Sequence, residues 1–122
     1  VDVAADKLYG GHFEILYNAN TYSWAGSKSA WCQQEVSIGA LISLEHTGQE
    51  WAKECFNEGD AYMMEKMRCP EFAFWTFGGG RKVSPPSTKV LEHYHMPRYL
   101  MRNMLAIQRI IKRGGKTSGL IS

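Results

Sequence analysis

The segment of residues 29–46 is a predicted helix with apolar side chains on nearly every side. They are Ala30, Trp31, Val36, Ile38, Ala40, Leu41, Ile42 and Leu44. Such a helix is stable only where neighbouring elements cover most of its circumference, so we expect it to be buried on most sides. Its first turns nevertheless carry Gln33, Gln34 and Glu35. Because buried polar groups must be hydrogen-bonded, we expect these three either to contact a ligand or to pair within the protein.

Residues 49–67 form a predicted amphipathic helix, which we expect to lie on the outside of the first one. Thr47 and Glu50 have the spacing of a capping box, which marks the start of this helix. Its several methionines are more typical of core packing than of a cofactor site. The sequence therefore predicts an inner helix followed by an outer helix.

The pentad Tyr94-His95-Met96-Pro97-Arg98 predicts the start of a further helix over about residues 97–113. Proline is favoured in the first helical turn, where its missing N–H would have no partner, and it disfavours helical geometry in the residue before it. His95 is therefore expected on a turn at the mouth of this helix, where it is accessible for proton transfer. Residues 114–122 begin with two glycines, a typical helix end, and are predicted to be a flexible tail.

Extended structure is predicted in two places. Residues 12–17 are rich in strand formers and precede the turn sequence Asn18-Ala19-Asn20, which predicts a short β-hairpin near the N-terminus. Residues 72–77 form a short aromatic segment, and a glycine- and proline-rich loop follows over 78–88. The order of inner helix, outer helix, extended connection and inner helix is the pattern of an α/α barrel.

Composition excludes several classes of protein. The 122 residues are the length of a single domain, 1–122, and the 44% hydrophobic content is enough for a core. The net charge of +2 is too small to indicate a nucleic-acid partner. Four basic residues near the end of the chain, Arg102, Arg109, Lys112 and Arg113, are interpreted as a solvated face that complements the helix dipole. No apolar run approaches the ~20 residues that a membrane span needs, so no membrane partner is expected.

The cysteines indicate a reducing compartment. The three of them, Cys32, Cys55 and Cys69, are odd in number and match neither a disulfide framework nor a zinc motif. Reduced thiols of a cytoplasmic protein are the expected state. No signal peptide is recognised, although the chain begins at Val1 rather than at a methionine, which leaves room for an upstream segment that was removed.

Trp31, Glu35 and His95 are the strongest candidates for a functional site. Trp31 and Glu35 are four residues apart on one helical face, and all three lie near predicted helix starts. Parallel inner helices would bring these starts together and form a pocket with a carboxylate, an imidazole and an aromatic wall, which suits sugar binding and acid/base chemistry. Each residue also has a structural interpretation: Glu35 as a cap or salt bridge, Trp31 as core, and His95 as a structural histidine. His93 and His95 are spaced as zinc ligands can be, but a third ligand is not visible, so neither a metal nor a cofactor is predicted.

Five motifs occur in a recognisable order. They are Gly10-Gly11-His12-Phe13, residues 28–35 (KSAWCQQE), Thr47-Gly48, residues 71–75 (EFAFW) and the pentad YHMPR. In this order and spacing, over about residues 6–111, the chain resembles the C-terminal part of the N-acylglucosamine 2-epimerase family. That family includes aldose-ketose isomerases and cellobiose 2-epimerases.

The resemblance implies a mainly α fold that is part of an (α/α)6 barrel, and a cofactor-independent mechanism. In that family two histidines exchange a proton at the sugar C2 through an enediolate, and His95 matches one of them. Glu35 matches a pocket carboxylate and Trp31 a sugar-facing tryptophan. Arg98 matches the arginine of the pentad motif, where we expect it to support the His95 turn. Arg98 and Gln34, the latter from the polar cluster, are further candidates for substrate contact.

The chain departs from the family in three respects. Ala30 replaces the first tryptophan of a pair, and Val90 stands where the cellobiose branch has a tryptophan. The resemblance covers only about the last third of the barrel, and the second histidine lies upstream in the family. Exposed inner helices would leave large apolar patches, which soluble monomers avoid. We therefore expect the missing barrel portion to be present separately, or the chain to form a homo-oligomer, or the piece to have repacked.

The leading functional hypothesis is a sugar 2-epimerase or aldose-ketose isomerase that acts on a monosaccharide or small sugar and is catalytically incomplete alone. One alternative is a non-catalytic carbohydrate-binding or interaction module. Another is a different carbohydrate-active enzyme on the same α/α toroid, because fold does not fix function. A glycoside hydrolase would usually need two opposed carboxylates, and Glu35 is the single inner-helix candidate.

Overall fold

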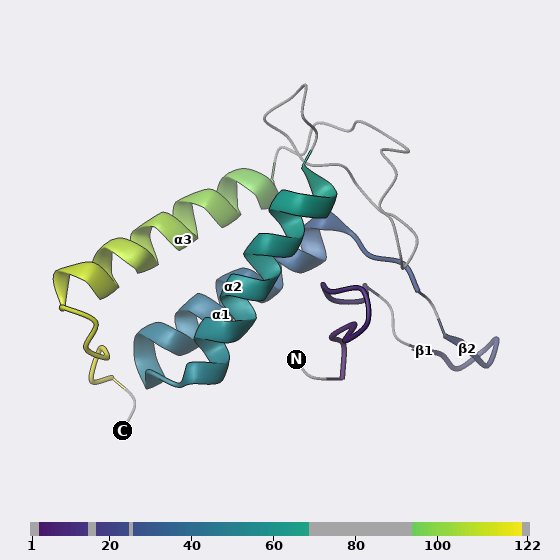
Figure 1. The fold of residues 1–122 in the computed structure, drawn as a ribbon, viewed down its shortest axis with the longest axis horizontal. Helices are drawn as coiled ribbons and strands as arrows, with labels where there is room; N and C mark the ends of the chain where they lie inside the picture. The colour runs from purple at the N-terminus through teal and green to yellow at the C-terminus, as the bar shows by residue number, and fades with distance from the viewer. Residues whose placement is uncertain (1–2, 15–16, 25, 69–93, 121–122) are drawn as a thin grey trace.

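The computed structural model describes residues 3–14, 17–24, 26–68 and 94–120, which are mainly helical (Figure 1). Helix α1 spans Ala30–Thr47, α2 spans Glu50–Tyr62 and α3 spans His95–Lys112, and a π-helical turn, η1 (Met63–Met67), continues α2. The predicted mainly α class is confirmed for these residues. The helix bounds agree with the predicted ones to within two positions, except that the α-helical part of the second helix ends at Tyr62 and η1 completes it to Met67. None of the described helices is long and apolar enough to cross a membrane. The predictions for residues 72–77 and 78–88, Val90 and His93 lie outside the described residues.

Helix α1 is the central element of the described structure, and it packs against both α2 and α3 (Figure 1). Its buried residues recur at intervals of three and four and so form one broad face of the helix. They are Ala30, Gln33, Gln34, Ser37, Ile38, Ala40, Leu41 and Glu45. Met63 and Met67 of η1 are fully buried in the same core, which confirms the packing role predicted for the methionines. The prediction that α1 is buried on most sides is therefore wrong in extent, because Ile42 is 42% exposed and Gly39 is also exposed, both on the side opposite the buried face.

Helices α1 and α3 run parallel, as inner helices of an α/α barrel would. Glu35 contacts Arg98 near the start of both helices. Asn103 then donates to Ser37 at 3.3 Å, and Glu45 binds Arg109 near the ends of both helices. Helix α2 runs in the opposite direction after a turn at Gly48, whose φ of 68° lies in the left-handed region that glycine tolerates.

Two details of the helix starts differ from the prediction. The capping box is wrong, because Thr47 is the last residue of α1 and its hydroxyl donates to the carbonyl oxygen of Ser43 at 2.7 Å. Glu50 instead accepts a hydrogen bond from Lys53 at 2.8 Å. Helix α3 begins at His95, two residues before the predicted start, so His95 is its first residue rather than part of a preceding turn. Pro97 lies in the first turn, as predicted.

Extended structure is short among the described residues. Strand β1 (Tyr17–Asn18) pairs antiparallel with β2 (Ser23–Trp24), and Tyr17 lies opposite Trp24. Ala5 and His12 form one isolated antiparallel bridge ahead of them. The strand predicted over residues 12–17 is thus reduced, where the structure describes it, to this bridge and one two-residue strand.

The amine of Lys28 anchors the N-terminal segment to the start of α1. It lies 3.0 Å from Oδ2 of Asp6, and both side chains are fully buried. The amine also donates to the carbonyl oxygen of Gly10 at 2.5 Å and lies over the rings of Phe13 and Tyr62. Because a buried charge is tolerated only when it is paired and hydrogen-bonded, this cluster fixes the path of the segment.

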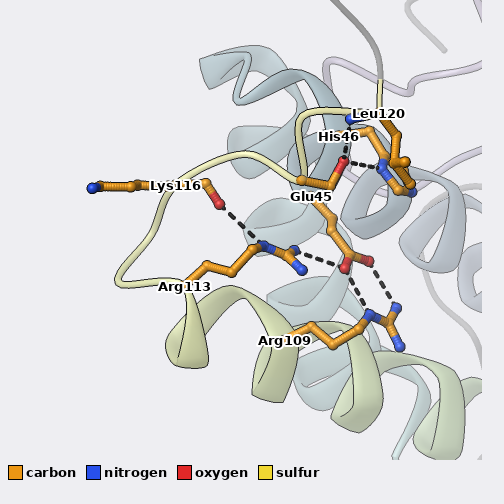
Figure 2. Close-up of polar contacts among 7 residues, drawn as sticks. Glu45, His46, Arg109, Arg113, Lys116 and Leu120 are labelled. Carbon is orange, nitrogen blue, oxygen red and sulfur yellow. Dashed lines mark hydrogen bonds and ion pairs between the residues drawn. The ribbon is translucent and has the colours of Figure 1, made fainter.

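The chain after α3 returns to the C-terminal end of α1 (Figure 2). The backbone N–H of Ser118 donates to the carbonyl oxygen of Glu45 at 2.9 Å, and its hydroxyl lies 2.6 Å from Nδ1 of His46. Arg109 and Arg113, which we interpreted as part of a solvated face, instead bind the buried carboxylate of Glu45. The end of the chain is therefore tied to α1 by specific contacts at residues 113–118.

Candidate functional site

Four of the five predicted site residues meet at the N-terminal ends of α1 and α3. Trp31 and Glu35 come from the first two turns of α1, and His95 and Arg98 from the first turn of α3. Because the two helices are parallel, their starts lie at the same end of the pair. Trp31 contacts His95 and Glu35 contacts Arg98, so the predicted residues form two contacting pairs at this end of the helices.

The imidazole of His95 contacts two aromatic rings. Its centroid lies 5.7 Å from that of Trp31, with the planes tilted by 38°. The ring of Tyr94 meets it edge-on at 4.9 Å and 86°. His95 is half-buried and Tyr94 is exposed. These aromatic contacts restrict the orientation of the imidazole.

Glu35 and Arg98 form an ion pair that joins α1 to the first turn of α3. Each side chain is about one third exposed, which leaves part of the pair open to solvent. The hydrogen bond to Glu35 raises the pKa of Arg98. Arg98 follows His95 by three residues, so this pair also fixes the turn that carries the imidazole. The salt-bridge interpretation of Glu35 is therefore observed, and it is compatible with a role beside His95.

The Gln34 side chain forms no hydrogen bond with the other four site residues among those described. Its side chain is 1% exposed, and its amide nitrogen lies 3.7 Å from Sδ of Met96. Its carbonyl oxygen is buried and lacks a hydrogen-bond partner among the described residues. The neighbouring Gln33 pairs internally, because its amide accepts from the backbone N–H of His12 at 2.7 Å and donates to the carbonyl oxygen of the same residue at 2.6 Å. Of the three polar residues at the start of α1, Gln33 therefore pairs within the protein and Glu35 belongs to the candidate site.

Tyr94 is the contact of this site to which the sequence analysis assigned no role. The signal was available, since an aromatic residue directly precedes the histidine in the pentad. The sequence alone could not show that the Tyr94 ring contacts the imidazole of His95, because neighbouring side chains at a helix start do not have a fixed relative orientation.

Two hollows lie elsewhere, between the N-terminal segment and α2. Their volumes are about 390 and 170 Å³, and Lys7, His12 and Glu58 line both. Burial lowers the pKa of His12, which favours the neutral imidazole. Neither hollow includes the residues of the predicted site.

The remaining chemistry of the described residues is limited. Cys32 and Cys55 form no disulfide within the described ranges, and burial raises the pKa of Cys32, which disfavours a reactive thiolate. Across the described ranges, no three His, Cys, Asp or Glu side chains gather as a metal site would require. The site at the helix starts can supply an imidazole for proton transfer, a carboxylate as hydrogen-bond acceptor and an aromatic face.

Comparison with known proteins does not extend this description. Neither a protein-family model nor a curated protein matches the chain. The family resemblance therefore depends on the order and spacing of the five motifs.

Proposed function

We propose that the chain is part of a sugar 2-epimerase or aldose-ketose isomerase similar to the N-acylglucosamine 2-epimerase family. In this proposal α1 and α3 are neighbouring inner helices of an (α/α)6 barrel and α2 is an outer helix. The parallel course of α1 and α3 and the antiparallel course of α2 support this arrangement. The substrate is a monosaccharide or another small sugar.

The observation that carries the proposal is the contact between His95 and Trp31 at the shared start of the two helices. It brings a group that can exchange protons next to an aromatic surface of the kind on which sugar rings stack. The ion pair between Glu35 and Arg98 lies at the same end and keeps a carboxylate within the site.

The proposed reaction is a proton transfer that needs no oxidant or reductant. The imidazole of His95 removes the proton from C2 of the open-chain sugar. The electron pair of the C–H bond forms a double bond between C1 and C2, and the π pair of the C1 carbonyl moves onto its oxygen to give an enediolate. Return of a proton to the other face of C2 gives the epimer, whereas its return to C1, with transfer of a proton from O2 to O1, gives the isomer. A second acid, which the resemblance places in another part of the barrel, completes the exchange.

The test is proton exchange at C2 in the complete protein, measured by NMR in deuterated water. The His95→Asn variant should lose at least about 100-fold of the exchange rate, since a positioned acid/base typically contributes that much or more. His46→Asn is the matched control, because His46 lies at the opposite end of α1 and contacts Ser118. Equal exchange rates for the native protein and His95→Asn would refute the role of His95.

A carbohydrate-binding module is the second candidate function. It is favoured by the ion pair itself, because the Glu35 carboxylate already has a partner in Arg98. This candidate predicts sugar-dependent quenching of tryptophan fluorescence that Trp31→Phe abolishes and Trp51→Phe retains. Saturable binding without any epimerisation or isomerisation of the same sugars would favour the module over the enzyme.

A further inference from the structure

The smaller hollow between the N-terminal segment and α2, which lie side by side in Figure 1, is lined by groups that suit a cation. Its volume is about 170 Å³. Lys7 and His12 line it from the N-terminal segment, and Trp51, Glu54 and Glu58 line it from α2. We call this space the small hollow. The residues of the candidate site at the helix starts do not line it.

The small hollow carries an excess of negative charge. Glu54 and Glu58 are four residues apart on α2, so their carboxylates border the same side of the helix and repel each other. Neither carboxylate forms a hydrogen bond or an ion pair with a residue that the structure describes. Lys7 is the one cationic side chain among the described lining residues. Two carboxylates and one amine leave a net negative charge, which a bound cation would compensate.

His12 adds an uncharged acceptor to the two carboxylates. The residue is 6% exposed, and its Nδ1 has no hydrogen-bond partner among the described residues. Burial is the main reason why the pKa of His12 is lowered, so its imidazole is neutral at pH 7. A neutral imidazole always presents one of its nitrogens as an acceptor. The two backbone hydrogen bonds between His12 and Gln33 hold the residue at the wall of the hollow.

These acceptors match a primary ammonium group better than a metal ion. An alkylammonium has three N–H donors on one nitrogen, and the small hollow has three acceptor side chains, those of Glu54, Glu58 and His12. Its hydrogen bonds span about 2.8–3.0 Å, against about 2.1 Å for a metal bond, so its acceptors can lie farther apart than metal ligands. In the described part of the chain, no three His, Cys, Asp or Glu side chains lie close enough together to hold a metal.

The size of the small hollow and the ring of Trp51 indicate what carries the ammonium. The volume of about 170 Å³ is below the roughly 300–1,000 Å³ of sites for drug-sized ligands, so it suits the end of a short aliphatic amine. The indole is 46% exposed, and its Nε1 donates to the side chain of Gln49, which fixes the ring. An aromatic ring of this kind attracts a cation and packs against methylene groups.

We propose that the small hollow is a binding site for a primary aliphatic ammonium group. The ammonium donates to the carboxylates of Glu54 and Glu58 and to the imidazole of His12, and the alkyl chain lies against the ring of Trp51. Binding here does not depend on the proposed sugar chemistry, because it uses none of the residues at the helix starts. Failure of the sugar assays would therefore leave it intact.

The experiment titrates the native chain with n-butylammonium chloride at constant ionic strength and follows the ring signals of His12 and Trp51 by NMR. We expect saturable binding with a dissociation constant on the order of 1 mM, as for a ligand of this size. Trimethylbutylammonium has the same charge but no N–H donor, so it should bind at least about 10-fold more weakly.

Three variants test the assignment of the residues. Glu58→Gln should weaken the binding of n-butylammonium at least about 10-fold, since a charge-assisted hydrogen bond becomes a neutral one. Glu50→Gln is the matched control and should bind like the native chain, because Glu50 lies on the same helix outside the hollow and pairs with Lys53. Lys7→Gln should strengthen binding about 3-fold, because it removes the opposing charge, and a loss of folding could not produce this result.

Several results would overturn the proposal. They are the absence of saturable binding, equal affinities of the native chain and Glu58→Gln, and weaker binding in Lys7→Gln. Equal binding of trimethylbutylammonium would show that the N–H donors are not recognised. Tighter binding of n-butylguanidinium than of n-butylammonium would show that the hollow selects a planar cation instead.

Discussion

At the residue scale, Glu45 connects the C-terminal ends of α1 and α3 (Figure 2). Its side chain is 3% exposed and accepts two hydrogen bonds from Arg109, at 2.6 and 2.7 Å, and one from Arg113 at 2.7 Å. The hydrogen bonds from Arg109 are the main reason why the pKa of Glu45 falls from 4.5 to about 2. Arg109 is itself half exposed, so solvent screens part of this interaction.

Glu45 should therefore make stability depend on pH in a defined window. Below about pH 4.5 the unfolded chain binds a proton at Glu45 while the folded chain does not, so the contribution of Glu45 declines as the pH falls from about 4.5 to about 2. Glu45→Gln should cost roughly 2 kcal/mol in the free energy of unfolding at pH 7, and this difference should shrink across that window. Urea denaturation at pH 7 and pH 3 measures it. Glu50→Gln is the control, because its partner Lys53 is exposed, and a pH-independent loss in Glu45→Gln would contradict the argument.

At the element scale, two glycines differ in what a methyl group would encounter. Gly11 has a φ of 70°, and an added Cβ would lie 2.7 to 2.9 Å from atoms of the Tyr62 ring. Gly39 lies within α1, and an added Cβ there would have no neighbour within 4 Å. The first glycine allows the N-terminal segment to lie against the end of α2, whereas the second weakens a helix without a packing benefit.

Gly11→Ala should thus lower the free energy of unfolding by about 1–3 kcal/mol, because the backbone is strained and the Tyr62 ring must move. Gly39→Ala should raise it by roughly 0.5–1 kcal/mol, since alanine restricts the unfolded chain and favours the helix. Thermal unfolding of both variants beside the native chain gives the comparison. The same sign of effect in both variants would show that contact with Tyr62 is not what requires Gly11.

At the scale of the whole molecule, the sequence was most informative where a pattern is local. The many apolar side chains within residues 29–46 predicted a central helix. The proline of the pentad predicted the start of α3 to within two residues. The sequence could not predict which face of a helix packs against its neighbour, nor which distant residues form ion pairs. The apolar residues of α3 did not reveal which stripe packs against α1, and the partners of Glu45 are more than 60 residues away in sequence. The capping-box prediction at Thr47 failed because the spacing of the motif does not show whether the preceding helix has ended.

The same limit applies to the candidate site. Trp31 and Glu35 could be placed on one face because residues four apart adjoin on a helix. Placing them near His95 required the assumption that the two helices are parallel, and α1 and α3 are parallel in the described structure. The sequence did not predict the positions of the Tyr94 and Gln34 side chains. The side-chain direction of Tyr94 and the burial of Gln34 depend on how α3 lies on α1 rather than on either segment alone.

The buried pair of Lys28 and Asp6 gives a test of how the N-terminal segment is held to the helices. Lys28→Met should cost about 3–5 kcal/mol in the free energy of unfolding, because it leaves the Asp6 carboxylate buried without its cation. Adding Asp6→Asn should recover part of this loss, since asparagine removes the charge but retains the oxygen that accepts from the backbone N–H groups of Leu8 and Tyr9. Lys53→Met is the control, because its pair with Glu50 is exposed to solvent and should contribute little to the free energy of unfolding. If Lys28→Met and Lys53→Met destabilise the chain equally in urea denaturation, the segment is held by packing on Tyr62 rather than by this charge pair.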